Sequence, residues 1–184
     1  MKRNAFIAIV ILAAIGIAGR LLPHLPNATP IAALAFIGST YFGRKTAILL
    51  PLAVLFITDA IIGFYSLGIM VSVYASFTLI AILSWYAQKQ KCILTRGYMI
   101  MFGSVSFFII TNATVWWLSP WYEKSLSGLL YSYELGLPFL RNMLLGDVVY
   151  TFTLLGTFAT IPYFIQISKN VWISKTNGQT IESC

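Results

Sequence analysis

Long apolar runs, separated by short charged or Pro/Gly-rich segments, dominate the pattern of hydrophobic and polar positions along the chain. This pattern predicts an all-helical integral membrane protein, a bundle of six transmembrane helices. The second run would cover only about 20 Å of a bilayer core of about 30 Å, so it must be sheltered by its neighbours or not cross fully. The spans are expected at Ala5–Leu22, Pro30–Phe42, Thr46–Phe64, Leu67–Ala87, Gly97–Leu118 and Asn142–Gln166.

The same pattern sets the expected domain organisation. Residues 1–168 are expected to form a single transmembrane domain, and residues 169–184 a loose polar tail in the cytoplasm. The first run is interpreted as an uncleaved helix rather than a secretory signal, because further apolar runs follow it. An aromatic loop of about twenty residues, from Ser119 to Arg141, is expected to face outward as a lid or binding loop.

Composition supports the membrane assignment and adds an orientation. The 184 residues are 59% hydrophobic and 9% charged, and the mean hydropathy is +0.83, whereas soluble domains carry about 25% charged residues. If the N-terminus is cytoplasmic, three of the 12 Lys and Arg residues lie outside, namely Arg20, Lys124 and Arg141, and the others lie inside. We therefore expect both termini in the cytoplasm and the chain in the inner membrane. The basic balance then reports orientation, and no nucleic-acid partner is expected.

Polar side chains collect at the outer ends of several predicted spans. A charged residue within a span costs about 2.5 to 3.5 kcal/mol on insertion scales, so each one needs a reason. Asp59 and Asp147 are the two charged residues clearly inside, at similar depth. Other polar or aromatic candidates end the first span, follow it in a proline-rich loop, or lie on and after the fifth span. The candidate substrate-binding residues are Arg20, His24, Asn27, Asp59, Asn112, Trp116, Tyr122, Asn142 and Asp147.

These groups are expected to enclose a small solute beneath the outer surface. The carboxyl and amide groups would hydrogen-bond it, Trp116 and Tyr122 would stack on a ring, and the loop with His24 would close over it. Two carboxylates disfavour an anion unless arginines neutralise them, so a neutral, zwitterionic or cationic solute is expected.

A structural alternative exists for the same residues. Arg20 with Asp59, or Arg141 with Asp147, could form ion pairs that close the bundle. The tryptophans could form an aromatic belt at the membrane interface, and His24 could hydrogen-bond within its loop. On this alternative the chain is a small structural or assembly protein of the membrane with no solute.

Several kinds of enzyme lack their signature residues in this sequence. There is no Gly-x-x-x-x-Gly-Lys-Ser/Thr phosphate loop and no His-Glu-x-x-His motif, and the chain has one histidine and two distant cysteines. No ATPase, zinc protease, disulfide framework or metal cluster is therefore indicated. We expect no enzymatic activity, no cofactor and no metal site.

Four motifs together carry a resemblance to a known group of proteins. They are the run from Arg20 to Ala35, Thr58-Asp59-x-x-Ile62-Gly63, Thr111-Asn112-x-x-x-Trp116, and the run from Leu137 to Asp147. They resemble an uncharacterised bacterial membrane family related to the substrate-binding S-components of energy-coupling-factor (ECF) transporters. The resemblance implies a six-helix S-component-like fold that binds a vitamin or other micronutrient near the outer face.

The resemblance also implies partners. S-components usually depend on a transmembrane coupling subunit and two ATPases, although some relatives work alone as solitary vitamin transporters. Ala14 and Ala18 match the spacing of the Ala-x-x-x-Ala element with which the first helix of S-components docks to its partner. Small residues four apart also suit helix packing within one bundle, so both interpretations stay open for this pair.

Overall fold

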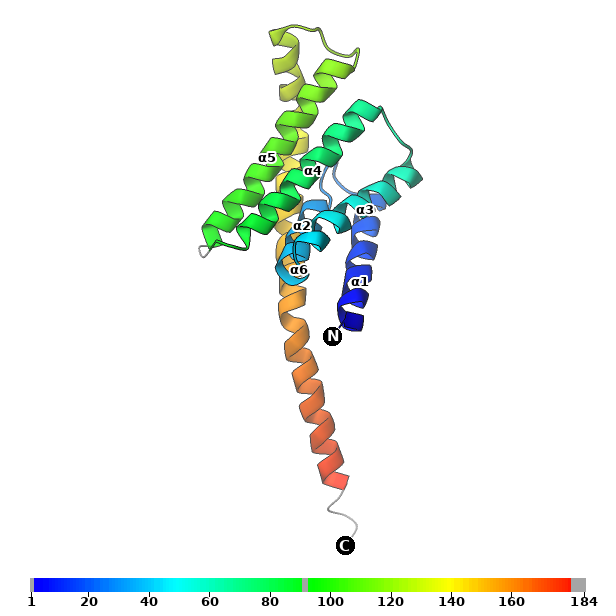
Figure 1. Ribbon diagram of the computed structural model, residues 1–184, viewed down its shortest axis with the longest axis vertical. Coiled ribbons are helices and arrows are strands. Elements are labelled where there is room, and N and C mark those ends of the chain that lie inside the picture. Colours follow the sequence, from blue (N-terminus) through cyan, green and yellow to red (C-terminus); the bar gives the residue numbers. More distant parts are fainter. Residues whose placement is uncertain (1, 91–92, 180–184) are drawn as a thin grey trace. The chain divides into compact units, whose positions relative to one another are not determined.

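The computed structural model describes the backbone of residues 2–90 and 93–179, and the side chains of residues 4–90 and 95–160. In these parts of the chain all regular secondary structure is helical, as the sequence predicts (Figure 1). The chain divides into two compact units, Met1–Thr151 and Phe152–Cys184. The six helices are α1 (Lys2–Leu21), α2 (Ile31–Tyr41), α3 (Arg44–Ile62), α4 (Leu67–Ala87), α5 (Ile93–Leu118) and α6 (Leu126–Gln179).

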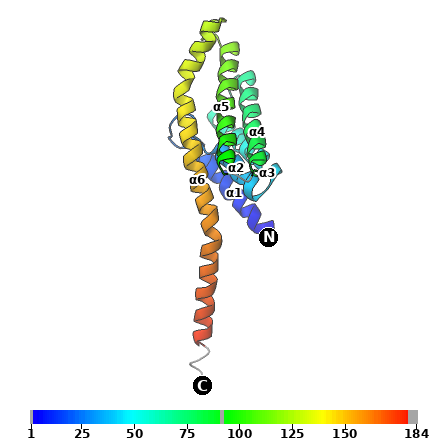
Figure 2. The same ribbon diagram turned by 90° about the vertical axis from the view of Figure 1, so that its left-hand side faces the viewer.

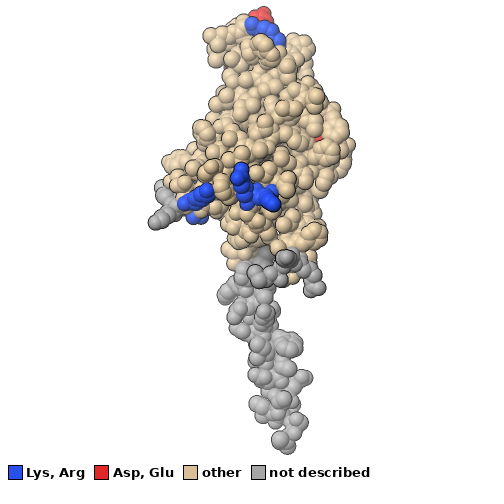
Figure 3. All heavy atoms as spheres, in the orientation of Figure 1, with Lys and Arg blue, Asp and Glu red and all other residues tan. Residues whose placement is uncertain are grey.

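Five of these helices, all except α2, are long and apolar enough to cross a membrane. The chain is therefore a multi-pass membrane protein by the length and composition of its helices. Its charges are also segregated: on the face shown in Figure 3, most Lys and Arg atoms gather in one band and most of the remaining surface is uncharged. Arg44 and Lys89 lie in contact with the ring of Trp85, at 5.0 and 3.9 Å from its centroid. Basic and aromatic side chains together are typical of a membrane–water interface.

The short helix α2 is sheltered by its neighbours, which was one of the two expectations for it. Every residue from Ile31 to Ser39 is buried. The helix packs against α1, α3 and α4. At Gly38 an added Cβ would lie 3.1 Å from the backbone of Ala47, so the absence of a side chain lets α2 and α3 approach closely.

Helices α1, α3, α4 and α5 of the first unit pack against one another in pairs. Helices α4 and α5 lie side by side in both views (Figures 1 and 2), and α3 packs on α1 and α4. Helix α3 is bounded by Gly43 and Gly63, whose φ values of 88° and 114° suit glycine and few other residues. The amide of Gly63 donates to the carbonyl of Asp59 (2.9 Å) and so closes the last turn of α3.

The expectation of a long loop from Ser119 to Arg141 is wrong. Helix α6 already begins at Leu126, so the connection after α5 is short. The first turns of α6 pack on α5: Tyr133 lies 5.6 Å from Phe108, ring to ring, and its hydroxyl donates to the carbonyl of Ile109 (3.2 Å). An added Cβ at Gly136 would lie 2.6 Å from Asn112. Gly136 therefore serves close helix packing, whereas the sequence pattern was interpreted as a turn.

Apart from both ends of α6, the predicted helix ends lie within four residues of the observed ones, and Leu67–Ala87 agrees at both ends. Helix α6 continues to Gln179, through most of the segment expected to be a polar tail, and residues 180–184 lie outside the described part of the chain. On α1, Leu12 and Gly16 are buried, whereas Ala14 and Ala18 are exposed. The pair Ala14 and Ala18 therefore does not serve packing within this bundle.

Candidate functional site

A cavity of about 210 Å³ lies within the first unit. Its wall comes from the end of α1, the loop between α1 and α2, the loop between α3 and α4, and all five of the helices α2 to α6. Of the nine residues predicted to bind a solute, three line it: Arg20, Asn27 and Asp147. The other lining residues are Thr29, Ile31, Ala32, Leu55, Tyr65, Val73, Phe77, Phe107 and Met143.

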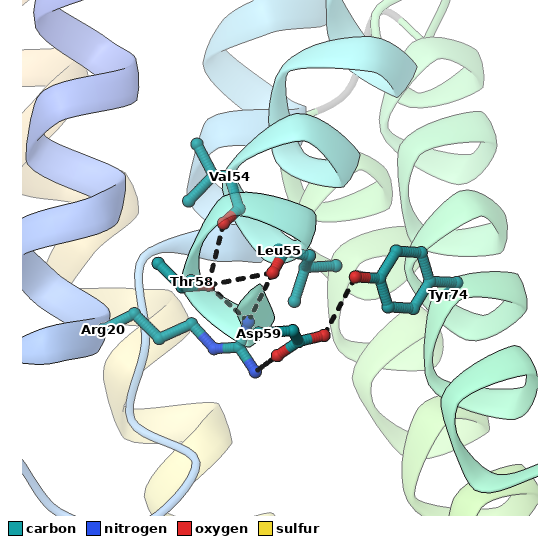
Figure 4. Close-up of polar contacts among 6 residues, drawn as sticks. All are labelled: Arg20, Val54, Leu55, Thr58, Asp59 and Tyr74. Atoms are coloured by element: carbon teal, nitrogen blue, oxygen red, sulfur yellow. Dashed lines mark hydrogen bonds and ion pairs between the residues drawn. The ribbon is translucent and has the colours of Figure 1, made fainter. Parts of the chain in front are cut away.

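Arg20 is held by a buried network at one side of this cavity (Figure 4). Its Nη2 forms an ion pair with Asp59 Oδ1 at 2.7 Å, and Asp59 is 2% exposed. Its Nη1 donates to Thr58 Oγ1 (2.6 Å) and to the carbonyl of Leu55 (3.2 Å). The hydroxyl of Tyr74 donates to the other oxygen of Asp59 at 2.9 Å. The network joins α1, α3 and α4, and it realises the ion pair that the structural alternative expected between Arg20 and Asp59.

Asp147 occupies a different environment. It is 5% exposed, and its Oδ2 accepts a hydrogen bond from Ser104 of α5 at 2.5 Å. Among the described residues it has no ion-pair partner. The expected alternative pair of Arg141 with Asp147 does not form, since Arg141 lies on an exposed position of α6. A separation of six residues does not bring the two side chains onto one face of a helix.

The loop between α1 and α2 closes one side of the cavity. Asn27 has a φ of 65°, a left-handed conformation that asparagine tolerates better than most residues. The next turn is tight, because the amide of Thr29 donates to the carbonyl of Asn27 (3.0 Å). An added Cβ at Gly146 would lie 2.9 Å from the backbone of Ala28, so α6 contacts this loop directly. His24 is exposed, and its Nδ1 donates to the carbonyl of Leu22 (2.7 Å), the hydrogen bond within the loop that the structural alternative expected.

Aromatic residues that the sequence did not single out also line the cavity. Phe77 of α4 and Phe107 of α5 have ring centroids 4.8 Å apart and both line the cavity. Tyr65 lies in the loop between α3 and α4. Burial raises the pKa of Tyr65, the negative charge of Asp59 raises it further, and Arg20 partly opposes both. The phenol of Tyr65 is therefore a protonated donor at neutral pH.

Asn112, Trp116 and Tyr122 do not line the cavity. Asn112 lies within α5, where its side chain donates to the carbonyl of Phe108 (2.9 Å) and its own carbonyl accepts from Ser132 of α6 (3.2 Å). Trp116, in the last turn of α5, donates from Nε1 to the carbonyl of Glu123 in the connection to α6 (2.8 Å). Tyr122 contacts the ring of Tyr131. Lys124 donates to the carbonyls of Trp116 and Ser119 at the end of α5. These interactions explain how the turn between the two helices is fixed.

Asn142, the ninth predicted residue, is partly exposed on α6 and also lies outside the cavity wall. Conversely, Tyr65, Phe77, Ser104 and Phe107 belong to the site or its partners although they were not predicted. Ser104 carried a usable signal, because it is a small polar residue in an apolar span. A buried acid on another span needs a hydrogen-bond donor, and such a residue can supply one. The phenylalanines carried none, since every predicted span contains at least one phenylalanine.

The site also limits what chemistry is available. Among the described residues, no three His, Cys, Asp or Glu side chains form a group that could hold a metal ion. The cavity wall instead offers the guanidinium of Arg20, which Asp59 pairs, the acid of Asp147, amide and hydroxyl groups, and aromatic rings.

Comparison with known proteins gives one match. The family DUF6580, described as a family of unknown function, matches residues 1–169. No curated protein and no solved structure matches the chain.

Proposed function

The chain belongs to DUF6580, a family of unknown function, and from the geometry of its cavity we propose that it is the substrate-binding membrane subunit of an uptake system for a small micronutrient. The cavity carries this proposal. Inside an apolar bundle it gathers Arg20, Asp147, Asn27, Thr29 and Tyr65 around a volume of about 210 Å³. Polar and ionisable groups in a membrane bundle are costly, and they most often mark a substrate or ion pathway.

The volume indicates the size of the solute. Pockets for drug-sized ligands measure roughly 300 to 1,000 Å³, so the cavity suits a smaller molecule. A vitamin or a vitamin precursor of modest size fits this limit. In the proposed arrangement the cavity opens on the outer side of the inner membrane, with both termini in the cytoplasm, and the solute enters past the loop between α1 and α2.

The proposal includes an energy source outside this chain. An ECF-type coupling subunit with its two ATPases would dock on the face of α1 that exposes Ala14 and Ala18. Small residues let another helix approach α1 closely, and in lipid such contacts favour helix association. If the chain instead takes up its solute alone, the face of α1 with Ala14 and Ala18 contacts only lipid.

The test is a thermal-unfolding screen of the purified protein against vitamins and other micronutrients. A ligand at 100 times its dissociation constant stabilises the folded state by about 2.7 kcal/mol. Ala32→Leu should abolish the shift, because Ala32 lines the cavity and a larger side chain fills it. Ala60→Leu is the matched control, since Ala60 is exposed on α3.

The competing candidate is a structural protein in which the polar groups only lock the helices. The observation that favours it is the Arg20–Asp59 network, in which both oxygens of Asp59 have partners within the protein. The structural candidate does not explain why Asp147 has no charge partner among the described residues, and it gives the cavity no role. If no compound in the screen shifts melting of the wild-type protein, the structural candidate replaces the proposal.

A further inference from the structure

The two acids near the cavity differ in how their charges are compensated. The charge of Asp59 is compensated by Arg20, whose guanidinium also donates to Thr58 and to the carbonyl of Leu55. Asp147 has a hydroxyl partner, Ser104, and among the described residues no cation within ion-pair distance. With the ion pair counted as neutral, the charged groups on the cavity leave one carboxylate uncompensated.

An isolated carboxylate in a low-dielectric site is unfavourable unless a counter-charge joins it. A cation that enters the cavity would supply this counter-charge, and attraction between the two would be much stronger there than in water. An anion would be repelled by Asp147, and the positive charge of Arg20 is already compensated by Asp59. Asp147 Oδ2 accepts the Ser104 hydrogen bond, and Oδ1 accepts none from the described residues.

The remainder of the wall also suits a cation. Phe77 and Phe107 present two tilted rings with centroids 4.8 Å apart. Aromatic faces attract ammonium groups, and this attraction strengthens when water is excluded. Asn27, Thr29 and Tyr65 also line the cavity and could hydrogen-bond a polar end of the same molecule.

We infer that the cavity binds a small organic cation, with its ammonium group on Asp147 and its apolar part against Phe77 and Phe107. This inference rests on the proposed function and specifies its substrate class. The cavity volume of about 210 Å³ corresponds to about seven water molecules, so the cation is a compact one.

The experiment compares three probes of nearly equal size that differ in charge: benzylammonium, benzyl alcohol and benzoate. Each is titrated into the purified full-length protein in lipid nanodiscs, and the dissociation constant is taken from thermal unfolding. Val73→Phe narrows the cavity from α4 and should abolish binding inside it. A probe's effect is counted as binding in the cavity only if this variant loses it, because partition of the probe into lipid would not depend on Val73. Benzylammonium is expected to bind at least about tenfold more tightly than benzyl alcohol, and benzoate not at all.

Asp147→Asn is expected to bring benzylammonium to the level of benzyl alcohol while benzyl alcohol still binds, which also shows that the variant folds. Phe107→Leu should weaken benzylammonium more than benzyl alcohol, because it removes a ring and keeps apolar volume. Glu134→Gln is the matched control: it removes one carboxylate charge at an exposed position of α6 and should change nothing.

Three results would overturn the inference. One is equal affinity of the wild-type protein for benzylammonium and benzyl alcohol, or no binding of benzylammonium at tens of millimolar. Another is a cation preference that survives Asp147→Asn. The third is stabilisation by sodium or potassium chloride that requires Asp147 and excludes benzylammonium, which would assign the carboxylate to an inorganic ion. The proposed function could still hold in each case. It would be supported by a neutral or zwitterionic micronutrient that stabilises the wild-type protein in the screen and does not stabilise the Ala32→Leu variant.

Discussion

At the scale of single residues, the central contrast is between a paired and an unpaired acid. The sequence places Asp59 and Asp147 in apolar spans, and it places Arg20 and Arg141 at the expected outer ends of other spans or of the same span. Nearness along the chain predicts the pairing poorly: Arg141 is close to Asp147 in sequence and does not contact it, whereas Arg20 reaches Asp59 from another helix. Which arginine pairs depends on the rotation of each helix in the bundle, and packing sets that rotation.

The Arg20–Asp59 pair leads to a stability prediction. Asp59→Asn would leave the guanidinium of Arg20 without its counter-charge, and breaking a buried pair typically costs 3–5 kcal/mol. Because Arg20 keeps 18% exposure, we expect a loss of about 3 kcal/mol in the free energy of unfolding, at the low end of that range. The measurement is denaturant-induced unfolding in mixed micelles.

Tyr74→Phe is the matched comparison for the same network. It removes the hydroxyl that donates to Asp59 but leaves the ion pair intact, so a loss of about 1 kcal/mol is expected. Equal losses for Tyr74→Phe and Asp59→Asn would contradict the view that the ion pair dominates the network.

At the scale of elements, helix positions were largely predictable, because apolar runs of bilayer length have well-defined ends at charges, prolines and glycines. The start of α6 was not predictable in the same way. Gly128, Gly136 and Pro138 are turn formers in a soluble context, yet all three lie within α6. In a membrane bundle such residues are tolerated inside helices, and glycine there allows a close approach to the next helix.

The candidate site was predictable in its acids and in the proline-rich loop, and not in its aromatic wall. Asn112 and Trp116 were expected in the site because they share a helical face. They contact instead the first turns of α6 and the connection before it, since α6 begins earlier and covers that face of α5. The start of α6 was predicted too late along the chain. For this reason Asn112, Trp116 and Tyr122 were expected in the site although they lie outside the cavity wall.

The close contact between Gly146 of α6 and the loop before α2 leads to a prediction about solute binding and stability. Gly146→Ala would place a Cβ 2.9 Å from the backbone of Ala28, so the loop must move. Because this loop carries Asn27 and Thr29, we expect weaker solute binding together with a stability loss of about 1–3 kcal/mol. Gly97→Ala is the control: its added Cβ meets nothing within 4 Å, and it should leave both properties unchanged or add slightly to stability.

The exposed face of α1 gives a second prediction at this scale. Replacing both Ala14 and Ala18 by leucine would enlarge the surface on which a coupling subunit is proposed to dock. Solute uptake by cells should fall by at least about tenfold while binding to the purified protein stays unchanged. Leucine at Ala60, which is exposed on α3, should leave both unchanged. Loss of binding in the α1 variant would show that these alanines act inside this chain.

At the scale of the whole molecule, α2 decides the topology. Its 11 residues span about 17 Å, little more than half of the bilayer core, and its burial inside the bundle removes the usual need for length. If α2 crosses, the chain has an even number of spans and both termini share one side. If it does not, the termini lie on opposite sides, and Arg20 at the end of α1 would lie across the membrane from Asp59 at the end of α3, which their ion pair contradicts.

Labelling of single cysteines in intact cells with a membrane-impermeant maleimide distinguishes these topologies. The distribution of Lys and Arg favours the crossing, because it places three basic residues outside and the others inside. In a background without Cys92 and Cys184, Asn4→Cys should be protected until the cells are lysed, and Glu123→Cys in the turn after α5 should be labelled at once. Restored Cys184 should be protected like Asn4→Cys. Labelling of Asn4→Cys in intact cells, with Cys184 still protected, would show that α2 turns back within the membrane. The first span would then be inverted, and the loop that carries Asn27 and Thr29 would face the cytoplasm, where it could not admit a solute from outside.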